Sequence, residues 1–192
     1  MDELRSPVAR YRRWFTGGGA RMAGAALVLV LAGSMALVVA RGAGAGAPEP
    51  LAYAAASLDD LGRAVIDAMR AGDVASLERL ALSEEEFRAH VWPSLPISEP
   101  RRNFPFDVAW GMLHENSRNH LRQTVAGIGR EQLTLIRVEF AGATSDYGDG
   151  VKVYRDTRLV VRDAAGAVRT LELYGSTIEQ DGRWKVFSYV VD

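Results

Sequence analysis

The chain contains no cysteine, and this absence excludes several classes of protein at once. Without a thiol the chain carries no disulfide, no cysteine nucleophile and no cysteine for lipid attachment. The last point matters because Leu31–Ser34 resembles a bacterial lipobox in which serine stands where lipidation requires cysteine. We therefore expect neither a lipoprotein nor a thiol enzyme.

Lysine and histidine are also scarce. Among 23 basic residues only Lys152 and Lys185 are lysines, and the histidines are His90, His114 and His120. The spacing of these histidines matches no ligand pattern of a metal site, so we expect neither a metal nor another cofactor. The 24 acidic residues leave a net charge of −1, which offers no electrostatic basis for binding nucleic acid.

Three motifs that mark common enzymes are missing as well. The sequence holds no G-x-S-x-G, no P-loop and no G-x-G-x-x-G. Gly17–Gly19 precede an apolar run instead of following a strand, so they do not form a phosphate-binding loop. The motifs therefore name no reaction.

What the chain does have is a long uncharged run, Met22–Ala40, between Arg21 and Arg41. Its 19 residues would reach about 28 Å as a helix, close to the hydrocarbon thickness of a bilayer. Arginines crowd the segment before the run, whereas after Arg41 the next basic residue is Arg63. The positive-inside bias therefore predicts a transmembrane helix in the lipid bilayer, with a cytoplasmic N-terminus and an extracytoplasmic C-terminal part.

Three outcomes compete for this segment. An uncleaved signal anchor is favoured, because the run is longer than the core of a usual signal peptide. Cleavage after Ala43–Ala45 or Ala45–Ala47 would release a secreted protein, although Pro48 should hinder cleavage at the second place. Export by the twin-arginine route is the third outcome, because Tyr11–Phe15 resembles part of such a signal.

The sequence divides into four segments. We expect a basic cytoplasmic segment at residues 1–21, the membrane helix at 22–40, a small-residue linker at 41–56 and a folded domain at 57–192. Roughly 140 residues are enough for one well-buried domain.

The first half of this domain carries the signals of four helices. Each begins with a capping side chain followed by apolar residues at helical spacing, and Ser83–Glu86 also fits a capping box. An ordered, extended loop is expected over Trp92–Pro105, and Val108 and Met112 should face inward on the fourth helix. The predicted N-caps are Ser57, Asp73, Ser83 and Asp107, and the predicted stops are Gly72, the prolines after Trp92, and Gly127 with Gly129.

From residue 133 onward the apolar period changes to two, which is typical of strands. Helices followed by three or four antiparallel strands indicate an α+β domain. We predict a polar loop at Ala141–Gly150 and a two-residue hairpin turn at Asp181-Gly182. The predicted strands are Leu133–Phe140, Val151–Arg162, Val168–Glu179 and Arg183–Val191.

The final hairpin, Glu179–Val186, has the form D-G-x-W-K around its turn. With helices before long strands, it resembles the NTF2-like (SnoaL-like) superfamily over about Ser57–Asp192. The resemblance implies a cone in which a curved sheet wraps around helices and a pocket, with Trp184 packed on the helices. Trp92–Pro105 is an insertion in that pattern. No position matches the acid–base pair of the family, so no catalytic residue is carried over.

A dense polar cluster lies between residues 110 and 120. If this segment is helical, Trp110, His114, Ser117 and Arg118 share one side at spacings of three and four. A histidine near a serine and an arginine can move a proton or hold an anion, so these four are the ligand-binding candidates. The alternative is that they tie the helix to the neighbouring loop or face solvent.

Tyr154 and Tyr174 join His114 as catalytic candidates. The resemblance implies a cone into which both tyrosines and Glu172 could project, and such groups move protons beside a carbonyl in NTF2-like isomerases and cyclases. The alternative is that Glu172 forms cross-strand charge pairs with neighbours such as Arg158 on a solvated face.

Two functions follow as hypotheses. The first is a membrane-anchored extracytoplasmic module that binds a partner protein or a small ligand, with the sheet face open to a homodimer or another protein. The second is a small-molecule isomerase, dehydratase or cyclase with a pocket between helices and sheet. A carboxylate or tyrosine beside His114 in a pocket would favour the second.

Overall fold

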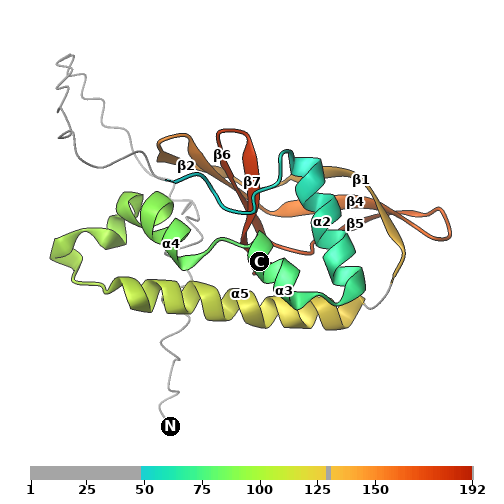
Figure 1. Ribbon diagram of the computed structural model, residues 1–192, viewed down its shortest axis with the longest axis horizontal. Coiled ribbons are helices and arrows are strands. Elements are labelled where there is room, and N and C mark those ends of the chain that lie inside the picture. The colour runs from blue at the N-terminus through green and yellow to red at the C-terminus, as the bar shows by residue number, and fades with distance from the viewer. Residues whose placement is uncertain (1–48, 129–130, 192) are drawn as a thin grey trace, which may run out of the picture. The chain divides into compact units, whose positions relative to one another are not determined.

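The computed structural model describes residues 49–128 and 131–191, which fold as an α+β domain with helices first and strands second (Figure 1). This fold class is the one predicted. The predicted membrane segment Met22–Ala40 and the lipobox-like Leu31–Ser34 lie outside the described residues. Among the described helices, none combines the length and the apolar character that a membrane crossing needs.

The first two helices begin and end where their capping residues predict. Helix α2, Leu58–Ala71, starts after Ser57, whose side chain accepts the amide three residues later, and it stops at Gly72. Gly72 has a φ of 67°, the left-handed conformation that favours glycine at a helix end. Helix α3, Val74–Leu80, is capped by Asp73 in the same way as α2 by its serine.

The third helix starts as predicted but does not continue as an α-helix. Helix α4, Glu84–Glu86, opens with a complete capping box in which Ser83 and Glu86 bond each other's amides. The chain then forms a π-helical turn, η1 (Phe87–Val91), which buries His90. Turns of this kind are rare in proteins.

The proline-rich segment after Trp92 is not the extended loop that was expected. It forms the 3₁₀ turns η2 (Trp92–Ser94), η3 (Pro96–Ser98) and η4 (Pro100–Arg102). Each turn holds a proline among its first two residues, where a missing N–H leaves no hydrogen bond unmade.

Helix α5, Phe106–Ile128, begins before Asp107, so this residue lies in the first turn instead of capping it. Gly127 lies within the last turn, and Gly129 is outside the described residues. Val108, expected to face inward, is exposed. The buried stripe runs instead through positions four apart, which are Ala109, Leu113, Ser117 and Leu121.

The described residues form seven strands, because two of the four predicted strands, 151–162 and 168–179, are each broken near the middle and the predicted loop Ala141–Gly150 contains a strand of its own. The strands are β1 (Leu133–Phe140), β2 (Thr144–Gly148), β3 (Val151–Arg155), β4 (Thr157–Asp163), β5 (Val168–Leu171), β6 (Ser176–Gln180) and β7 (Arg183–Ser188).

The strands form two antiparallel sheets, with the orders β1-β4-β5 and β2-β3-β6-β7. Hydrogen bonds continue across the breaks: the Ala141 amide donates to the Asp156 carbonyl, and the Thr157 amide to the Gly175 carbonyl. Asp156 has a φ of 52° and lies between β3 and β4, as a bulge residue does where a strand bends. The seven segments therefore make one meander of four strands, of which three are bent and β7 is not.

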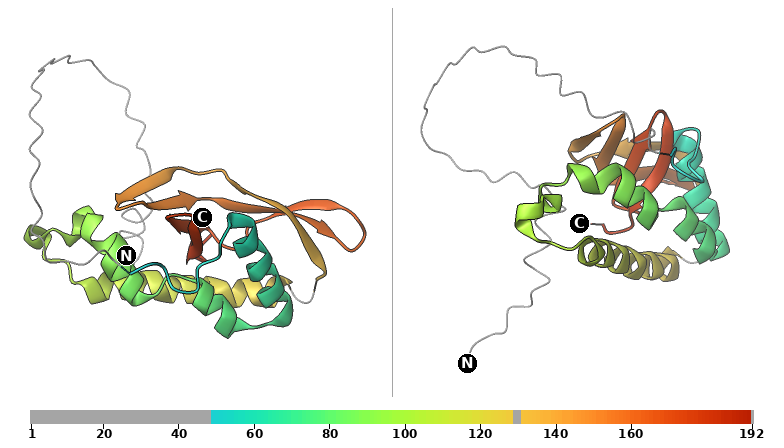
Figure 2. Two further views of the ribbon diagram at one scale, coloured as in Figure 1. Left: turned by 45° about the horizontal axis from the view of Figure 1, so that its top comes forward. Right: turned by 60° about the vertical axis from the view of Figure 1, so that its left-hand side comes forward.

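The core lies between the helices and the inner side of this meander. In both views of Figure 2 the strands lie on one side of the domain and α5 on the other, with α2 spanning the two at one end. Gly62 lets α2 approach β1 closely, because a Cβ there would lie 2.9 Å from the side chains of Leu135 and Val138. The buried core includes Leu61, Val65, Met69, Leu77, Leu121, Leu159, Val161, Leu173, Tyr174, Val186 and Tyr189.

The outer edge of β7 is covered by two short segments of chain. Ala55 exchanges two backbone hydrogen bonds with Trp184, at 2.8 and 3.0 Å, and the Leu82 amide donates to the Val186 carbonyl at 2.8 Å. Leu51, only 3% exposed, is buried just before. The end of the expected linker at 41–56 is therefore part of the folded domain. Because these segments pair with β7, this edge of the sheet is covered and does not offer free backbone groups to another chain.

Candidate functional site

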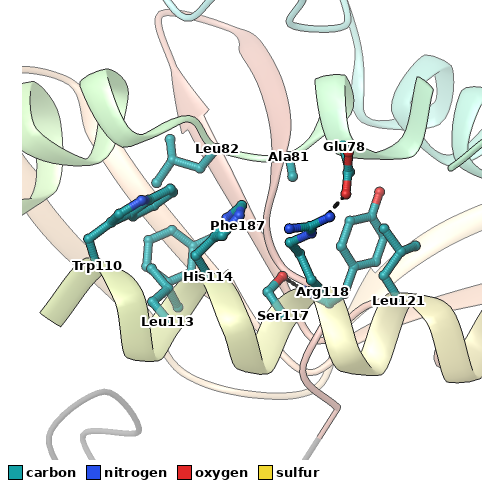
Figure 3. Close-up of a pocket in the computed structure, with 11 residues that line it drawn as sticks. Glu78, Ala81, Leu82, Trp110, Leu113, His114, Ser117, Arg118, Leu121 and Phe187 are labelled. Carbon is teal, nitrogen blue, oxygen red and sulfur yellow. Dashed lines mark hydrogen bonds and ion pairs between the residues drawn. The ribbon is translucent and has the colours of Figure 1, made fainter. Parts of the chain in front are cut away.

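A shallow cleft lies between α3, α5 and β7 (Figure 3); it encloses about 40 Å³, or about 400 Å³ when the open solvent at its mouth is counted. One of its walls is the side of α5 that carries all four ligand-binding candidates, Trp110, His114, Ser117 and Arg118. Their spacing of three and four along one helix places them side by side, as predicted. The rest of the cleft is lined by Glu78, Ala81, Leu82, Leu113, Leu121, Phe187 and Tyr189.

One end of the cleft is aromatic and apolar. The rings of Trp110 and His114 stack at 5.1 Å between centroids and 27° between planes. Behind Trp110 lies the fully buried ring of Phe87, at 5.6 Å. Leu82 and Leu113 are buried at the same end. The stacked pair is itself only half-buried, so it offers ring surface to the cleft.

The other end of the cleft carries an ion pair between the two helices. Arg118 Nε donates to Glu78 Oε1 at 2.9 Å, and the two side chains are 43% and 40% exposed. Figure 3 shows Glu78 reaching from α3 toward Arg118 on α5. A pair this exposed contributes little stability. The terminal nitrogens of Arg118 make no hydrogen bond to the described residues, so they are open to a ligand.

Ser117 has a structural partner at the floor of the cleft. Its hydroxyl accepts the backbone amide of Tyr189 at 3.0 Å, which holds the chain after β7 against α5. The Tyr189 hydroxyl in turn donates to the Leu77 carbonyl at 2.8 Å. Burial raises the pKa of the Tyr189 phenol well above its usual range, and the neighbouring Tyr174 and Glu78 raise it further. Tyr189 is therefore a neutral hydrogen-bond donor.

His114 shares the cleft with a carboxylate and a phenol, but both are already bonded. Glu78 pairs with Arg118, and the Tyr189 hydroxyl donates to a backbone carbonyl. The imidazole of His114 makes no hydrogen bond to any residue that the structure describes. The cleft therefore presents ring surface and a guanidinium, whereas a proton relay through His114 would require these bonds to rearrange.

Tyr154 lies away from this cleft. Its ring stacks on Phe140 at 4.6 Å and lies 5.5 Å from that of Trp184. Trp184 is half-buried against the core.

Glu172, expected either in the cone or in a cross-strand pair, forms the pair. It accepts from Arg158 Nε at 3.2 Å, and both side chains are more than two-fifths exposed. A pair of this kind on neighbouring strands is a common use of such residues.

Tyr174 is buried in the core, edge-on to Tyr189 at 6.4 Å. Burial raises the pKa of the Tyr174 phenol far above its usual range, and the nearby Thr177 hydroxyl offsets only part of this. Within the described residues, the Tyr174 hydroxyl has no hydrogen-bond partner of normal geometry. The structure therefore does not bring His114, Tyr154 and Tyr174 together.

Sequence reasoning missed a buried ion pair between β7 and α4. Lys185 Nζ lies 3.0 and 2.8 Å from the two oxygens of Glu86, with side chains 2% and 9% exposed. The Glu86 carboxylate also accepts the amides of Ala52 and Ser83, each at 2.7 Å. The capping-box pattern identified Glu86, but no local pattern marked Lys185 as buried. The pair joins the segment before α2 to α4 and β7.

Neither a metal-binding cluster in the described residues nor a similarity to a known protein indicates what the cleft binds. In residues 49–128 and 131–191, no group of three or more acidic or histidine side chains could hold a metal ion. The chain matches no protein-family model, no curated protein and no solved structure. We therefore argue function from the residues of the cleft.

Proposed function

We propose that this chain is a membrane-tethered, extracytoplasmic domain of NTF2-like architecture that binds a small ligand in the cleft between α3, α5 and β7. The observation that carries the proposal is that Trp110, His114 and Arg118 open from one helix into one cleft. The enclosed part of the cleft is only about 40 Å³, so a ligand there would lie partly exposed along α5 and would not be engulfed.

Binding is favoured over catalysis by the state of the polar groups. Glu78 and Tyr189 are the cleft groups best suited to exchange a proton with His114, and each is held in another bond. An isomerase, dehydratase or cyclase remains the alternative function. It would require a substrate that separates Glu78 from Arg118 and thereby frees a base.

Two parts of the proposal rest on the chain outside the cleft. The tether rests on the length of Met22–Ala40 and on the arginines before it. The NTF2-like architecture is supported by helices that precede a meander of bent antiparallel strands, as the resemblance implies.

We also propose that the sheet face could bind a partner protein or a second copy of the chain, and the side chains there indicate what kind of contact this would be. Two exposed ion pairs lie on this part of the domain: Arg137–Glu139 on β1, and Arg158–Glu172 between β4 and the segment after β5. A partner on this face would therefore meet charged side chains more than apolar ones.

The test is a ligand-observed NMR screen of small ring compounds against the full chain in nanodiscs. We expect at least one compound to bind, and Trp110→Leu and His114→Leu to weaken it by about tenfold or more. Arg122→Ala is the matched control, because Arg122 is exposed on the same helix and does not line the cleft. Binding that ignores the two cleft variants, or a screen without any hit, contradicts the proposal. Chemical conversion of a bound compound would favour the enzyme.

A further inference from the structure

We infer that the ligand of this cleft is a small aromatic carboxylic acid whose ring and carboxylate are one or two carbon atoms apart. The inference rests on the proposed function, because it names the class of molecule that the same cleft would bind. The ring would stack on the Trp110–His114 pair, and the carboxylate would bind Arg118.

The aromatic end of the cleft sets the first requirement. Trp110 and His114 present a stacked, half-buried ring pair, and the Phe87 ring packs against Trp110 at 5.6 Å between centroids. Phe187 lines the cleft from β7 and is also half-buried. Aromatic rings prefer offset or edge-on contact with one another, and such contacts add to the gain from burial. A flat ring therefore gains more here than an aliphatic group of equal size.

The charged end sets the second requirement. Arg118 uses Nε for Glu78, and its terminal nitrogens make no hydrogen bond to the described residues. A guanidinium binds a carboxylate with two parallel hydrogen bonds, which a neutral amide cannot reproduce. Glu78 partly opposes an incoming anion, so the cleft should bind the acid more weakly than an unopposed arginine would.

The spacing along α5 sets the third requirement. His114 and Arg118 are four residues apart, about 6 Å along a helix axis, on the same side. A ring over the Trp110–His114 pair with its carboxylate attached through one or two carbons can therefore reach the guanidinium. A much longer carbon linker would carry the carboxylate past the guanidinium and out of the cleft.

The probes are 4-fluorophenylacetate, its neutral analogue 4-fluorophenylacetamide, and cyclohexylacetate, which keeps the acid without the aromatic ring. Binding to the full chain in nanodiscs is followed by ¹⁹F NMR for the fluorinated probes and by calorimetry for all three. We expect the aromatic acid to bind about tenfold or more tightly than either comparison. Equal binding of the acid and the amide would overturn the inference.

Two variants of the ion pair make the test specific. Arg118→Gln should reduce affinity for the acid to that of the amide and leave the amide unchanged. Glu78→Gln should raise affinity for the acid severalfold, because it frees Arg118 and removes the opposing charge. If the ion pair only stabilised the fold, both variants would change the affinity for the acid in the same direction. Both side chains are more than one-third exposed, so neither change should unfold the domain.

The remaining outcomes separate this inference from the proposed function. If other ring compounds bind the cleft but the aromatic acid does not, the ligand class is wrong and the binding function stands. If no compound of any kind binds, both are wrong. If Arg118→Gln leaves the affinity for the acid unchanged, the assignment of the carboxylate to Arg118 is wrong.

Discussion

At the residue scale, Tyr174 and Tyr189 are two buried tyrosines that differ in one hydrogen bond. The Tyr189 hydroxyl donates to the Leu77 carbonyl, whereas that of Tyr174 has no partner of normal geometry in the described ranges. We expect Tyr189→Phe to lower the free energy of unfolding by about 1 kcal/mol and Tyr174→Phe to leave it unchanged or raise it slightly. Urea unfolding followed by circular dichroism measures both. Equal losses would mean that Tyr174 has a bonding partner, such as Thr177, in solution.

The same two phenols predict how stability depends on pH. Burial raises the pKa of each in the folded state above its unfolded value near 10. Their contribution is therefore complete below about pH 10 and is lost as the pH rises above that value. In a spectrophotometric titration, the two tyrosines should ionise only when the domain unfolds in alkali. Each phenylalanine variant should remove part of that late step. Reversible ionisation of both near pH 10 in the folded domain would contradict the prediction.

Lys185 supports a third prediction. Lys185→Met keeps an unbranched side chain in the core but leaves the buried Glu86 carboxylate without its counter-charge. We expect a loss of about 3 kcal/mol in the free energy of unfolding. Lys152→Met is the matched control, because Lys152 is the other lysine of the chain and is half-buried on β3. Its loss should stay below about 1 kcal/mol. A neutral Lys185→Met would show that water already reaches the pair.

Residue-level reasoning predicted which side chains of α5 would lie together, because helical spacing is local. It did not predict the partners of those side chains. Glu78 comes from α3 and Tyr189 from the chain after β7, and no sequence pattern relates either to Arg118 or Ser117. The burial of Lys185 was missed for the same reason.

At the scale of elements, the break between β5 and β6 depends on Gly175. A Cβ at this position would overlap the Val190 carbonyl oxygen, and the Gly175 amide donates to the Ser188 carbonyl at 3.0 Å. We expect Gly175→Ala to lower the free energy of unfolding by about 3 kcal/mol or more, because backbone atoms must move to make room.

Gly111→Ala is the control for this prediction. Gly111 lies within α5, and nothing is near the position that its Cβ would take. Alanine there should stabilise the helix by up to about 1 kcal/mol, measured by the same thermal or urea unfolding. If the two variants behave alike, the close approach of Gly175 and Val190 is not present in solution.

The helix ends that local caps define were predictable, whereas the breaks within the long strands were not. Ser57, Gly72, Asp73 and the Ser83 capping box act on their own neighbours in the chain, so the sequence is sufficient to place them. The bend at Asp156 interrupts no alternating pattern. It depends on pairing with the Ala141–Ala143 segment of another strand, where Gly142 leaves space for the Asp156 side chain.

At the scale of the whole molecule, the proposed tether makes a prediction about topology. A periplasmic-type reporter such as alkaline phosphatase fused after Asp192 should be active, because the arginine distribution places the C-terminal part outside the cytoplasm. The same protein should sediment with membranes, and its N-terminus should be intact by mass spectrometry if Met22–Ala40 is an anchor. A soluble product that starts after Ala45 or Ala47 would indicate cleavage. If the alkaline phosphatase fusion is inactive and a reporter that works only in the cytoplasm is active at the same position, the C-terminal part lies in the cytoplasm and the predicted topology is wrong.

The folded domain would begin close to such a tether. The Ala52 amide donates to the Glu86 carboxylate, and Ala55 exchanges backbone hydrogen bonds with Trp184. Leu51 is also buried, so the first residues of the domain are held by α4 and β7. Strand β7 also leads into Tyr189, which lines the cleft. The segment that opens the domain and the floor of the cleft therefore share one strand.

By itself the sequence determined the α+β class, three of the four predicted helix N-caps, the Asp181-Gly182 hairpin and the shared face of Trp110, His114 and Arg118. Each depends on interactions within a few residues, or on a period that the chain displays directly. Only the tertiary structure decided the strand bends, the burial of Lys185 and the bonding of Glu78 and Tyr189 beside His114. Those features join segments far apart in the chain, and their energies depend on which surfaces become buried together.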